Sequence, residues 1–229
     1  MIPSGMRPDA VNAIVAGPGG VVWAGGRQGL WRVDGERIDV VAELGGHPVR
    51  SLCRDRDGSL WIGTEAGLSR LHQGRLDSLK APDGLPDAVV IALNEDREGG
   101  IWLGTYSGGL ARLRDSAFTG YSRADGLADN FVRTVLEARD GTMWMGTYRA
   151  GLSRLRDGVF TTYTTRDGLP ENTVFAIAES RDGSLWMGTN RGLSRLRHGR
   201  FETWSTHDGL PHDAVRALLE DRHLSLIHI

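Results

Sequence analysis

The sequence has very little cysteine, very little lysine and no long apolar segment. Cys53 is the only cysteine among the 229 residues, so no disulfide can form within the chain. The longest stretch that resembles a membrane segment, Ala13–Gly26, is interrupted by glycine and proline and is too broken to cross a bilayer. Lysine occurs once, at Lys80, and the arginines are spread along the chain, which argues against a nucleic-acid partner.

Glycine and tryptophan are the residues in excess. The chain has 32 glycines, and its seven tryptophans outnumber its five phenylalanines. Glycine at this level indicates many tight turns. With 40% hydrophobic residues and a net charge of −2, the chain can bury a sizeable core, which predicts a soluble globular protein.

Five tryptophans mark an internal repeat. Each opens a phrase that reads W-x-G-T, or W-A-G-G in the first copy, and the intervals between them are 38, 41, 42 and 42 residues. A Gly-Leu pair and then an Arg-Leu or Arg-Val pair follow in every copy. The five are Trp23, Trp61, Trp102, Trp144 and Trp186. A residue kept in one register five times has a structural role, and we expect these indoles to pack between adjacent sheets.

Each repeat divides into four short strands. A valine twelve residues before each tryptophan, as at Val132, indicates a buried strand, and Asp-Gly then forms a hairpin turn, as at Asp140–Gly141. A third strand reads Gly-Leu-Ser-Arg-Leu at Gly67–Leu71, and a fourth ends near Phe118–Tyr121. Asp-Gly-Leu-Pro, as at Asp167–Pro170, then ends strand pairing and leads to the next repeat.

Four-stranded units of about forty residues without helical periodicity predict a β-propeller of antiparallel blades. A helical solenoid would need apolar spacings of three and four residues, and a β-sandwich would not repeat one phrase five times. We expect a single propeller fragment over 1–223, with five blades, part of a sixth and an incomplete ring. The expected blades are approximately 11–45, 49–84, 88–126, 130–168, 172–209 and, in part, 213–223.

The repeat register continues toward both ends of the chain. Gly5 and Met6 stand where a Gly-Leu pair stands in later copies, so we expect the chain to begin inside a repeat. After Glu220 the expected Asp-Gly-x-Leu-Trp is replaced by His223 and a six-residue tail, Leu224–Ile229. That tail equals the translation of a sequencing-library adapter, and the hypothesis is that it is not native.

The repeat resembles those of the two-component regulator propeller family, whose consensus runs G-L-P, then D-G-x-L-W-x-G-T, then G-L-x-R. Residues Gly168–Pro170, Asp182–Thr189 and Gly192–Arg195 match it nearly throughout, whereas the first copy has Gly25–Gly26 in place of Gly-Thr. The resemblance implies the extracytoplasmic sensor region of a membrane receptor, and therefore a periplasmic location. It also implies partners in the same parent chain: further blades, a membrane helix, and an output domain such as a histidine kinase or a diguanylate cyclase.

No arrangement typical of catalysis or metal binding stands out. The sequence has no recognisable nucleophile and base pair, phosphate-binding loop or paired histidine spacing, so we predict no catalytic residue, no metal and no cofactor. His207 and His212 flank one Asp-Gly-Leu-Pro turn, but solvated loop histidines explain them better. Asp55–Gly58 resembles the start of a calcium loop but lacks the remaining oxygen ligands.

Binding residues are expected where the copies differ, on the loops at one end of the blades. These loops are the turn between the second and third strands and the crossover to the next blade. The candidate ligand-binding residues are Tyr106, Tyr148, Arg149, Asn190, Arg191, Asn130 and Asn172. The same loops also carry Arg27, Glu65, Asp87, Asp129, Glu171, His212 and Asp213. Aromatic, guanidinium and amide groups at one rim can stack on and hydrogen-bond a glycan or another small polar ligand.

An arginine precedes the closing leucine or valine of every third strand. The five are Arg32, Arg70, Arg112, Arg154 and Arg195. We expect them to pair with Glu95, Glu137 or Glu179 at the ends of the first strands, and to serve packing rather than ligand binding.

The residues and the resemblance together favour a binding and sensing module without catalysis. One alternative is part of a propeller enzyme, a lyase or a hydrolase, with its catalytic residues on missing blades. Another is a soluble protein-interaction scaffold. No nucleic acid is expected as a partner.

Overall fold

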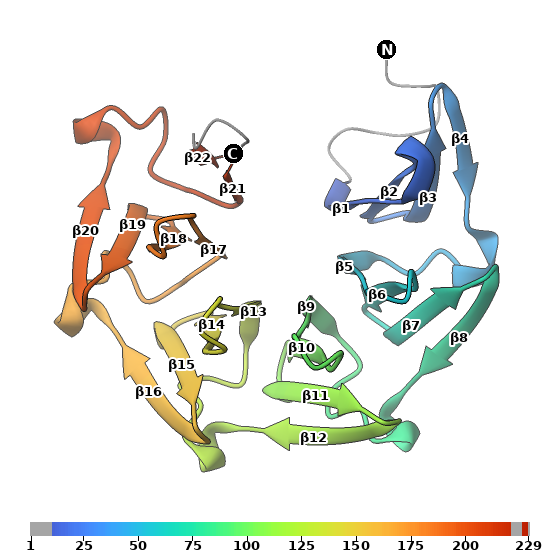
Figure 1. Ribbon diagram of the computed structural model, residues 1–229, viewed down its shortest axis with the longest axis horizontal. Helices are drawn as coiled ribbons and strands as arrows, with labels where there is room; N and C mark the ends of the chain where they lie inside the picture. Colours follow the sequence, from blue (N-terminus) through green and yellow to red (C-terminus); the bar gives the residue numbers. More distant parts are fainter. Residues whose placement is uncertain (1–10, 221–225, 229) are drawn as a thin grey trace. The chain divides into compact units, whose positions relative to one another are not determined.

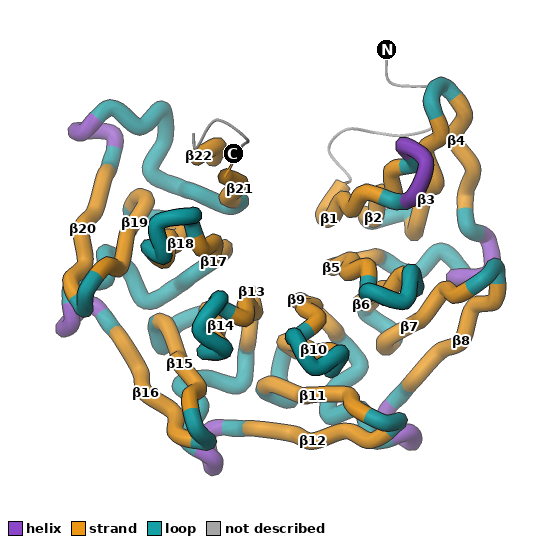
Figure 2. The backbone as a smooth tube through the Cα atoms, in the orientation of Figure 1, coloured by secondary structure: helices purple, strands orange, loops and turns teal. Residues whose placement is uncertain are grey.

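The computed structural model describes residues 11–220 and 226–228, which form an all-β structure (Figure 1). Five four-stranded antiparallel sheets follow one another along the chain, and the strands of each sheet pair in sequence order. In these residues every helix is a short 3-10 turn between strands (Figure 2), none is long and apolar enough to span a membrane, and no sheet closes on itself. The predicted all-β class with four-stranded antiparallel blades is confirmed.

The strands of the five sheets are short and similar in length. The first sheet contains β1 (Val11–Ala16), β2 (Val22–Gly26), β3 (Gly29–Asp34) and β4 (Arg37–Val40). The second contains β5 (Val49–Arg54), β6 (Leu60–Thr64), β7 (Gly67–His72) and β8 (Arg75–Leu79). The third contains β9 (Val90–Glu95), β10 (Ile101–Thr105), β11 (Leu110–Arg114) and β12 (Ala117–Tyr121). The fourth contains β13 (Val132–Glu137), β14 (Met143–Thr147), β15 (Leu152–Arg156) and β16 (Val159–Tyr163). The fifth contains β17 (Ala176–Glu179), β18 (Leu185–Thr189), β19 (Gly192–Arg197) and β20 (Arg200–Trp204).

A two-stranded sheet follows the fifth. It pairs β21 (Leu218–Glu220) with β22 (Leu226–His228), and β22 lies within the expected tail. The predictions that concern Gly5, Met6 and His223, and those for positions 224, 225 and 229, lie outside the described residues.

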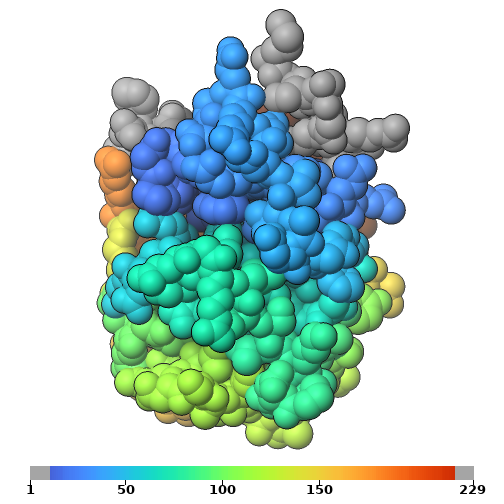
Figure 3. Space-filling model, turned by 90° about the vertical axis from the view of Figure 1, so that its right-hand side faces the viewer, coloured from blue at the N-terminus to red at the C-terminus, as the bar shows by residue number. Residues whose placement is uncertain are grey.

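The chain divides into two compact units. The first holds the described residues up to 105 together with 111–119, and therefore the first two sheets and most of the third. The second holds 106–110 and the residues from 120 onward, and therefore the fourth and fifth sheets. In the first unit the surface runs in sequence order from the first sheet, in blue, to the third, in green (Figure 3).

Within each unit, neighbouring sheets pack face to face through a hydrophobic core. In the first unit, Trp61 and Leu68 of the second sheet pack with Val90 and Leu103 of the third. Another hydrophobic core in the first unit joins the first two sheets. In the second unit, Trp144 of the fourth sheet lies in one cluster with residues of the fifth. The valine twelve residues before the tryptophan is fully buried in the second to fifth repeats, and so is the corresponding valine before β21. These residues are Val49, Val90, Val132, Val174 and Val215.

The glycine of the W-x-G phrase lets the next sheet approach closely. A Cβ atom added at Gly63 would lie 2.8 Å from Cγ1 of Val90, and one added at Gly146 would lie 2.8 Å from Cγ1 of Val174. Contacts between carbon atoms are normally no shorter than about 3.5 Å. A side chain at these positions would therefore push the adjacent sheet away.

The connection from the fourth strand to the next sheet is a 3-10 turn that its own side chains hold closed. Ser122 donates to Asp125 Oδ2 from its backbone N–H at 2.8 Å and from its hydroxyl at 2.9 Å. Gly126 ends this turn with a φ of 102°, which favours glycine. Thr164 and Ser205 begin equivalent turns after the fourth and fifth sheets. Within the described residues the 3-10 turns are Pro18–Gly20, Ala42–Leu44, Ala81–Asp83, Arg123–Asp125, Thr165–Asp167 and Thr206–Asp208.

Four of the repeated third-strand arginines pair with acidic residues of their own sheet. Arg112 lies 2.5 Å from Asp96 Oδ2, and Arg70 lies 4.0 Å from Asp55 Oδ2. The remaining two pairs are Arg32 with Asp34 and Arg195 with Glu202. The prediction that they would pair with the glutamates at the ends of the first strands was therefore wrong for these four, because nearer carboxylates lie on the same sheet.

Two of those glutamates instead bind an arginine from the preceding sheet. Glu95 accepts a hydrogen bond from the backbone N–H of Arg56 at 3.1 Å, and the Arg56 guanidinium donates to the carbonyl of Arg97 at 2.6 Å. Glu179 accepts from the backbone N–H of Arg139 at 2.8 Å. The first hairpin of one sheet is thus tied to the end of the first strand of the next.

Candidate ligand-binding site

In the fourth and fifth sheets, a threonine and a glycine close the turn between the second and third strands. In the fourth sheet the Thr147 hydroxyl donates to the carbonyl of Gly151 at 2.8 Å and accepts from the backbone N–H of Ala150 at 3.1 Å. In the fifth sheet the Thr189 hydroxyl donates to Gly192 at 2.9 Å in the same way. Because the threonine and glycine close the turn, the residues at its tip are free to differ between copies.

A hollow of about 580 Å³ lies in the second unit between two of these turns and the crossover from β16 to β17. It is lined by Tyr148, Arg149, Thr165, Pro170, Glu171, Asn172, Thr173, Asn190 and Arg191. Five of the seven predicted ligand-binding residues, Tyr148, Arg149, Asn172, Asn190 and Arg191, therefore lie around one space. Tyr106 and Asn130 do not line it.

Tyr106 is connected to the hollow by a row of aromatic rings. Its ring centroid lies 4.6 Å from that of Phe131, which lies 5.0 Å from that of Tyr148 in a stacked arrangement. Tyr106 is 55% exposed, so its ring offers a surface at the outer end of the row. Phe131 was not predicted as a site residue, although its position next to the candidate loop residue Asn130 was a signal that could have identified it.

Guanidinium groups lie over these rings. The Arg133 carbon Cζ lies 5.4 Å from the ring centroid of Phe131 and 4.6 Å from that of Phe175, and Arg149 Cζ lies 4.9 Å from that of Tyr148. Cation–π contacts of this kind hold both partners in place. Arg133 and Phe175 were also missed, but each directly follows the buried valine twelve residues before its tryptophan, so the repeat register could have located them.

The predicted amide residues have structural partners as well. Asn172 Oδ1 accepts a hydrogen bond from the backbone N–H of Thr165 at 2.9 Å, and Asn130 does the same for Arg123 at 2.9 Å. These oxygens hold the crossover turn, so the amide NH₂ of Asn172 is the group best suited to meet a ligand. Each predicted asparagine on a crossover therefore has a scaffold role in addition to any role in binding.

The charges around the hollow are not balanced. Glu171 is engaged by Asn190, whose backbone N–H donates to Glu171 Oε2 at 2.8 Å and whose side chain donates to Oε1 at 3.3 Å. Arg149 and Arg191 form no ion pair with any described residue. Two guanidinium groups facing one engaged carboxylate give the hollow a net positive charge.

The remaining candidate positions do not form a site. His212 Nδ1 accepts from the backbone N–H of Ala214 at 2.9 Å and so serves its own loop. Among residues 11–220 and 226–228, no three His, Cys, Asp or Glu side chains come together in a way that could hold a metal ion. Of the repeated tryptophans, Trp61, Trp102 and Trp144 are buried, and Trp23 and Trp186 are half-buried.

The sheets and their pairing define a protein of the β-propeller class. Four segments match the family model described as the two component regulator propeller, at residues 43–66, 84–107, 126–149 and 168–191. The chain therefore contains four repeats of the two component regulator propeller family. No curated protein sequence matches the chain.

Solved structures share the fold at low sequence identity. The extracellular domain of a B. thetaiotaomicron protein assigned to the hybrid two component systems superposes with a TM-score of 0.88 at 20% identity over 100% of this chain and 33% of that chain. Virginiamycin B lyase from Staphylococcus aureus, in a catalytically inactive form with quinupristin, superposes with a TM-score of 0.79 at 17% identity over 96% of this chain and 77% of that chain. The extracellular domain of a second B. thetaiotaomicron protein, assigned to the one component systems, superposes with a TM-score of 0.67 at 18% identity. The match covers 96% of this chain and 37% of that chain. The chain spans about a third of the length of both extracellular domains.

Proposed function

We propose that the chain is a ligand-binding β-propeller segment of the sensor region of a bacterial signal-transduction receptor, with no catalytic role for its described residues. The observation that carries this proposal is the hollow, because it gathers five residues that vary between copies into one space. The positions that the copies share are buried scaffold instead. Variable polar groups on a constant frame are the usual arrangement of a binding site.

The lining favours a small polar ligand such as a glycan. The Tyr148 ring offers a flat apolar face for a sugar ring, and Arg149 and Arg191 offer planar donors for hydroxyl or carboxylate oxygens. The amide of Asn172 adds a further donor. The hollow has few apolar residues, so hydrogen bonds and stacking would supply the affinity.

The receptor context is the second part of the proposal. The family repeats and the likeness to extracellular domains support a location outside the cytoplasmic membrane, in the periplasm. The partners would be further blades, a membrane segment and an output domain of the same parent chain. A propeller enzyme is the alternative, but the likeness to the lyase, at 17% identity, concerns the fold alone.

The proposal is tested by screening a glycan array of defined oligosaccharides with the purified chain, and then measuring affinities by isothermal titration calorimetry. We expect Tyr148→Ala and Arg149→Ala each to weaken binding of the best oligosaccharide about tenfold, which corresponds to about 1.4 kcal/mol.

Arg166→Ala is the matched control, because Arg166 is exposed on the same crossover and does not line the hollow. Equal affinity in Tyr148→Ala would remove this turn from the site. An oligosaccharide that is recovered cleaved would favour the enzyme, and an array without binding would rule out the glycan class.

A further inference from the structure

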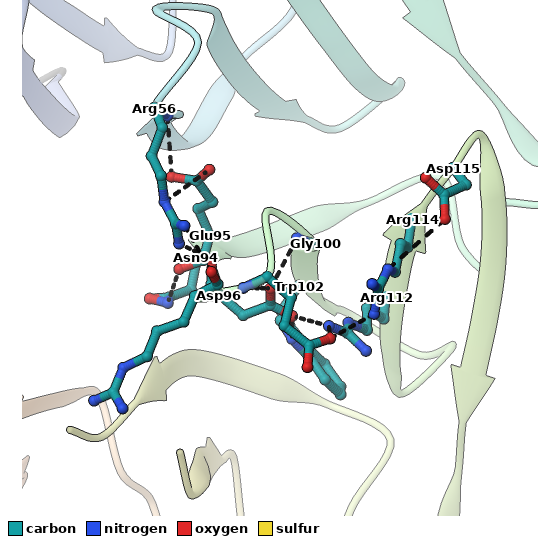
Figure 4. Close-up of polar contacts among 11 residues, drawn as sticks. Arg56, Asn94, Glu95, Asp96, Gly100, Trp102, Arg112, Arg114 and Asp115 are labelled. Atoms are coloured by element: carbon teal, nitrogen blue, oxygen red, sulfur yellow. Dashed lines mark hydrogen bonds and ion pairs between the residues drawn. The ribbon is translucent and has the colours of Figure 1, made fainter. Parts of the chain in front are cut away.

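In the third sheet, the Asp96 carboxylate binds both the indole N–H of the repeated tryptophan and the repeated third-strand arginine (Figure 4). Its Oδ2 accepts a hydrogen bond from the Trp102 indole N–H at 2.8 Å and lies 2.5 Å from a guanidinium nitrogen of Arg112. Its Oδ1 accepts from the backbone N–H of Gly100 at 2.8 Å. Burial acts to raise the pKa of Asp96, but these donors outweigh it and hold the pKa below its usual value, so the carboxylate is charged.

Other sheets place an oxygen at the same point, six residues before the tryptophan. In the second sheet, Asp55 Oδ2 accepts from the Trp61 indole N–H at 2.8 Å and lies 4.0 Å from Arg70. In the fifth sheet, the Ser180 hydroxyl accepts from the Trp186 indole N–H at 3.2 Å. A buried indole N–H without an acceptor is costly, which explains why an oxygen recurs there.

The fourth sheet has an alanine at this point. Ala138 stands six residues before Trp144, and the Trp144 indole N–H donates to no described residue. Arg154, paired across the strands with Trp144, forms no ion pair with a described residue. Its guanidinium has one hydrogen bond, to the Thr161 hydroxyl at 3.4 Å. In the second and third sheets an aspartate lies next to the indole N–H and the arginine. In the fourth sheet the Trp144 indole N–H and the Arg154 guanidinium therefore lack such a carboxylate.

A cavity of about 230 Å³ lies where the missing carboxylate would be. Ala138, Trp144 and Arg154 line it together with residues of the fifth sheet. None of its lining residues lines the hollow of the proposed ligand-binding site. The cavity is therefore separate from that hollow, and Asp140 of the turn between β13 and β14 is among its lining residues.

Two acidic residues also line this cavity, but both are engaged by other donors. Asp140 accepts from the backbone N–H of Thr142 at 3.0 Å and from Arg156 at 3.3 Å. Glu179 accepts from the backbone N–H of Arg139, whose guanidinium lies 3.9 Å away. Arg154 is left as the cation without a counter-charge, so the cavity favours an anion.

We propose that this cavity binds a small carboxylate of the formate or acetate class. One carboxylate oxygen would lie between the Trp144 indole N–H and the Arg154 guanidinium, as Asp96 Oδ2 lies between the equivalent groups of the third sheet. The bound anion thus replaces the side chain that Ala138 lacks. This site is independent of the proposed glycan site, because it uses different residues on different loops.

The site is tested by titrating the ¹⁵N-labelled chain with sodium formate while the indole N–H signals are followed by NMR. Trp144→Phe identifies the Trp144 signal by its loss. We expect this signal to shift downfield and to saturate with a dissociation constant on the order of 1 mM or weaker, because the binding energy available per non-hydrogen atom limits a three-atom ligand. Sodium chloride at equal ionic strength should give less than a tenth of that shift.

Ala138→Asp is the matched variant, since it supplies the carboxylate within the chain. In this variant the Trp144 signal should lie near those of Trp61 and Trp102 without formate and should no longer respond to it. Arg154→Gln should weaken formate binding at least tenfold, which keeps the test decisive if Ala138→Asp does not fold. A wild-type signal that ignores formate, that responds equally to chloride, or that still shifts in a folded Ala138→Asp protein overturns the proposal.

Discussion

At the scale of single residues, the repeated tryptophan keeps its place in every copy while its polar partner changes. The indole N–H of Trp61 and of Trp102 donates to an aspartate, and that of Trp186 donates to a serine. Trp144 has no such partner among the described residues and is still buried. Full or partial burial of the ring is therefore the property that these copies share, and it contributes most of what the residue adds to stability.

Trp144→Ala should lower the free energy of unfolding by about 3–5 kcal/mol, as is usual when a large buried aromatic side chain is deleted. The ring contacts the core that joins the fourth and fifth sheets, with Val174 and Met187 among its neighbours. The loss would leave a void between two sheets that cannot easily close. Urea denaturation followed by circular dichroism measures the change.

Val159→Ala is the control for this substitution. Val159 lies on β16 of the same sheet and is 64% exposed, so its replacement should change the free energy of unfolding by no more than about 0.5 kcal/mol. If Trp144→Ala were as mild as Val159→Ala, the indole would not belong to the core.

At the scale of strands and turns, the regular part of the structure could be predicted because it depends on short-range rules. A valine at a fixed distance from each tryptophan and the Asp-Gly turns locate the hairpins, as in β13 and β14. The same register also placed Tyr148 and Asn190 on turns that meet at one hollow. A repeated sequence pattern predicts strands and turns this well because every copy contains the same local signals.

The parts that could not be predicted depend on which side chains meet between copies. The stacking of Phe131 between Tyr106 and Tyr148 joins three separate segments of the chain. The partner of Glu95 is Arg56 from the preceding sheet, although one of the repeated third-strand arginines was expected. Distances of this kind follow from the angle between neighbouring sheets, which no single repeat encodes.

Gly146→Ala should destabilise the protein by about 1–3 kcal/mol, the usual cost of an additional methyl group in a packed core. An alanine Cβ at this position would lie 2.6 Å from Cγ2 of Thr134 and 2.8 Å from Cγ1 of Val174. The valine belongs to the next sheet, so relief of the clash requires the two sheets to separate. Thermal unfolding followed by circular dichroism measures the effect.

Gly120→Ala is the matched control on strand β12. A Cβ atom at Gly120 would have no neighbour within 4 Å, and its backbone does not adopt a positive φ. We expect its melting temperature to equal that of the wild type. A Gly146→Ala protein with an unchanged melting temperature would show that the glycine is not needed for sheet packing.

At the scale of the whole molecule, the charges are nearly balanced, and many of them are engaged locally. The 27 basic and 29 acidic residues give a net charge of −2. The carboxyl groups of Asp96, Asp125, Asp140, Asp182 and Asp208 all have a pKa below the usual value, because backbone N–H groups, hydroxyls or arginines donate to them. Each of these carboxylates binds protons less readily in the folded chain than in the unfolded chain, which links stability to pH.

The protein should therefore lose stability as the pH falls from about 4 toward 2, and Asp182 allows the cause to be tested. Hydrogen bonds from Ser180 and Ser184 lower its pKa from 3.8 to about 2. A carboxyl group whose pKa is lowered in the folded chain stabilises the fold at pH values above its unfolded pKa, and that stabilisation disappears as the pH falls through its folded pKa.

Asp182→Asn should accordingly be less stable than the wild type at pH 7, and the difference in urea midpoint between the two proteins should shrink toward zero at pH 2. A difference that stayed constant from pH 7 to pH 2 would show that the charge on Asp182 does not stabilise the fold.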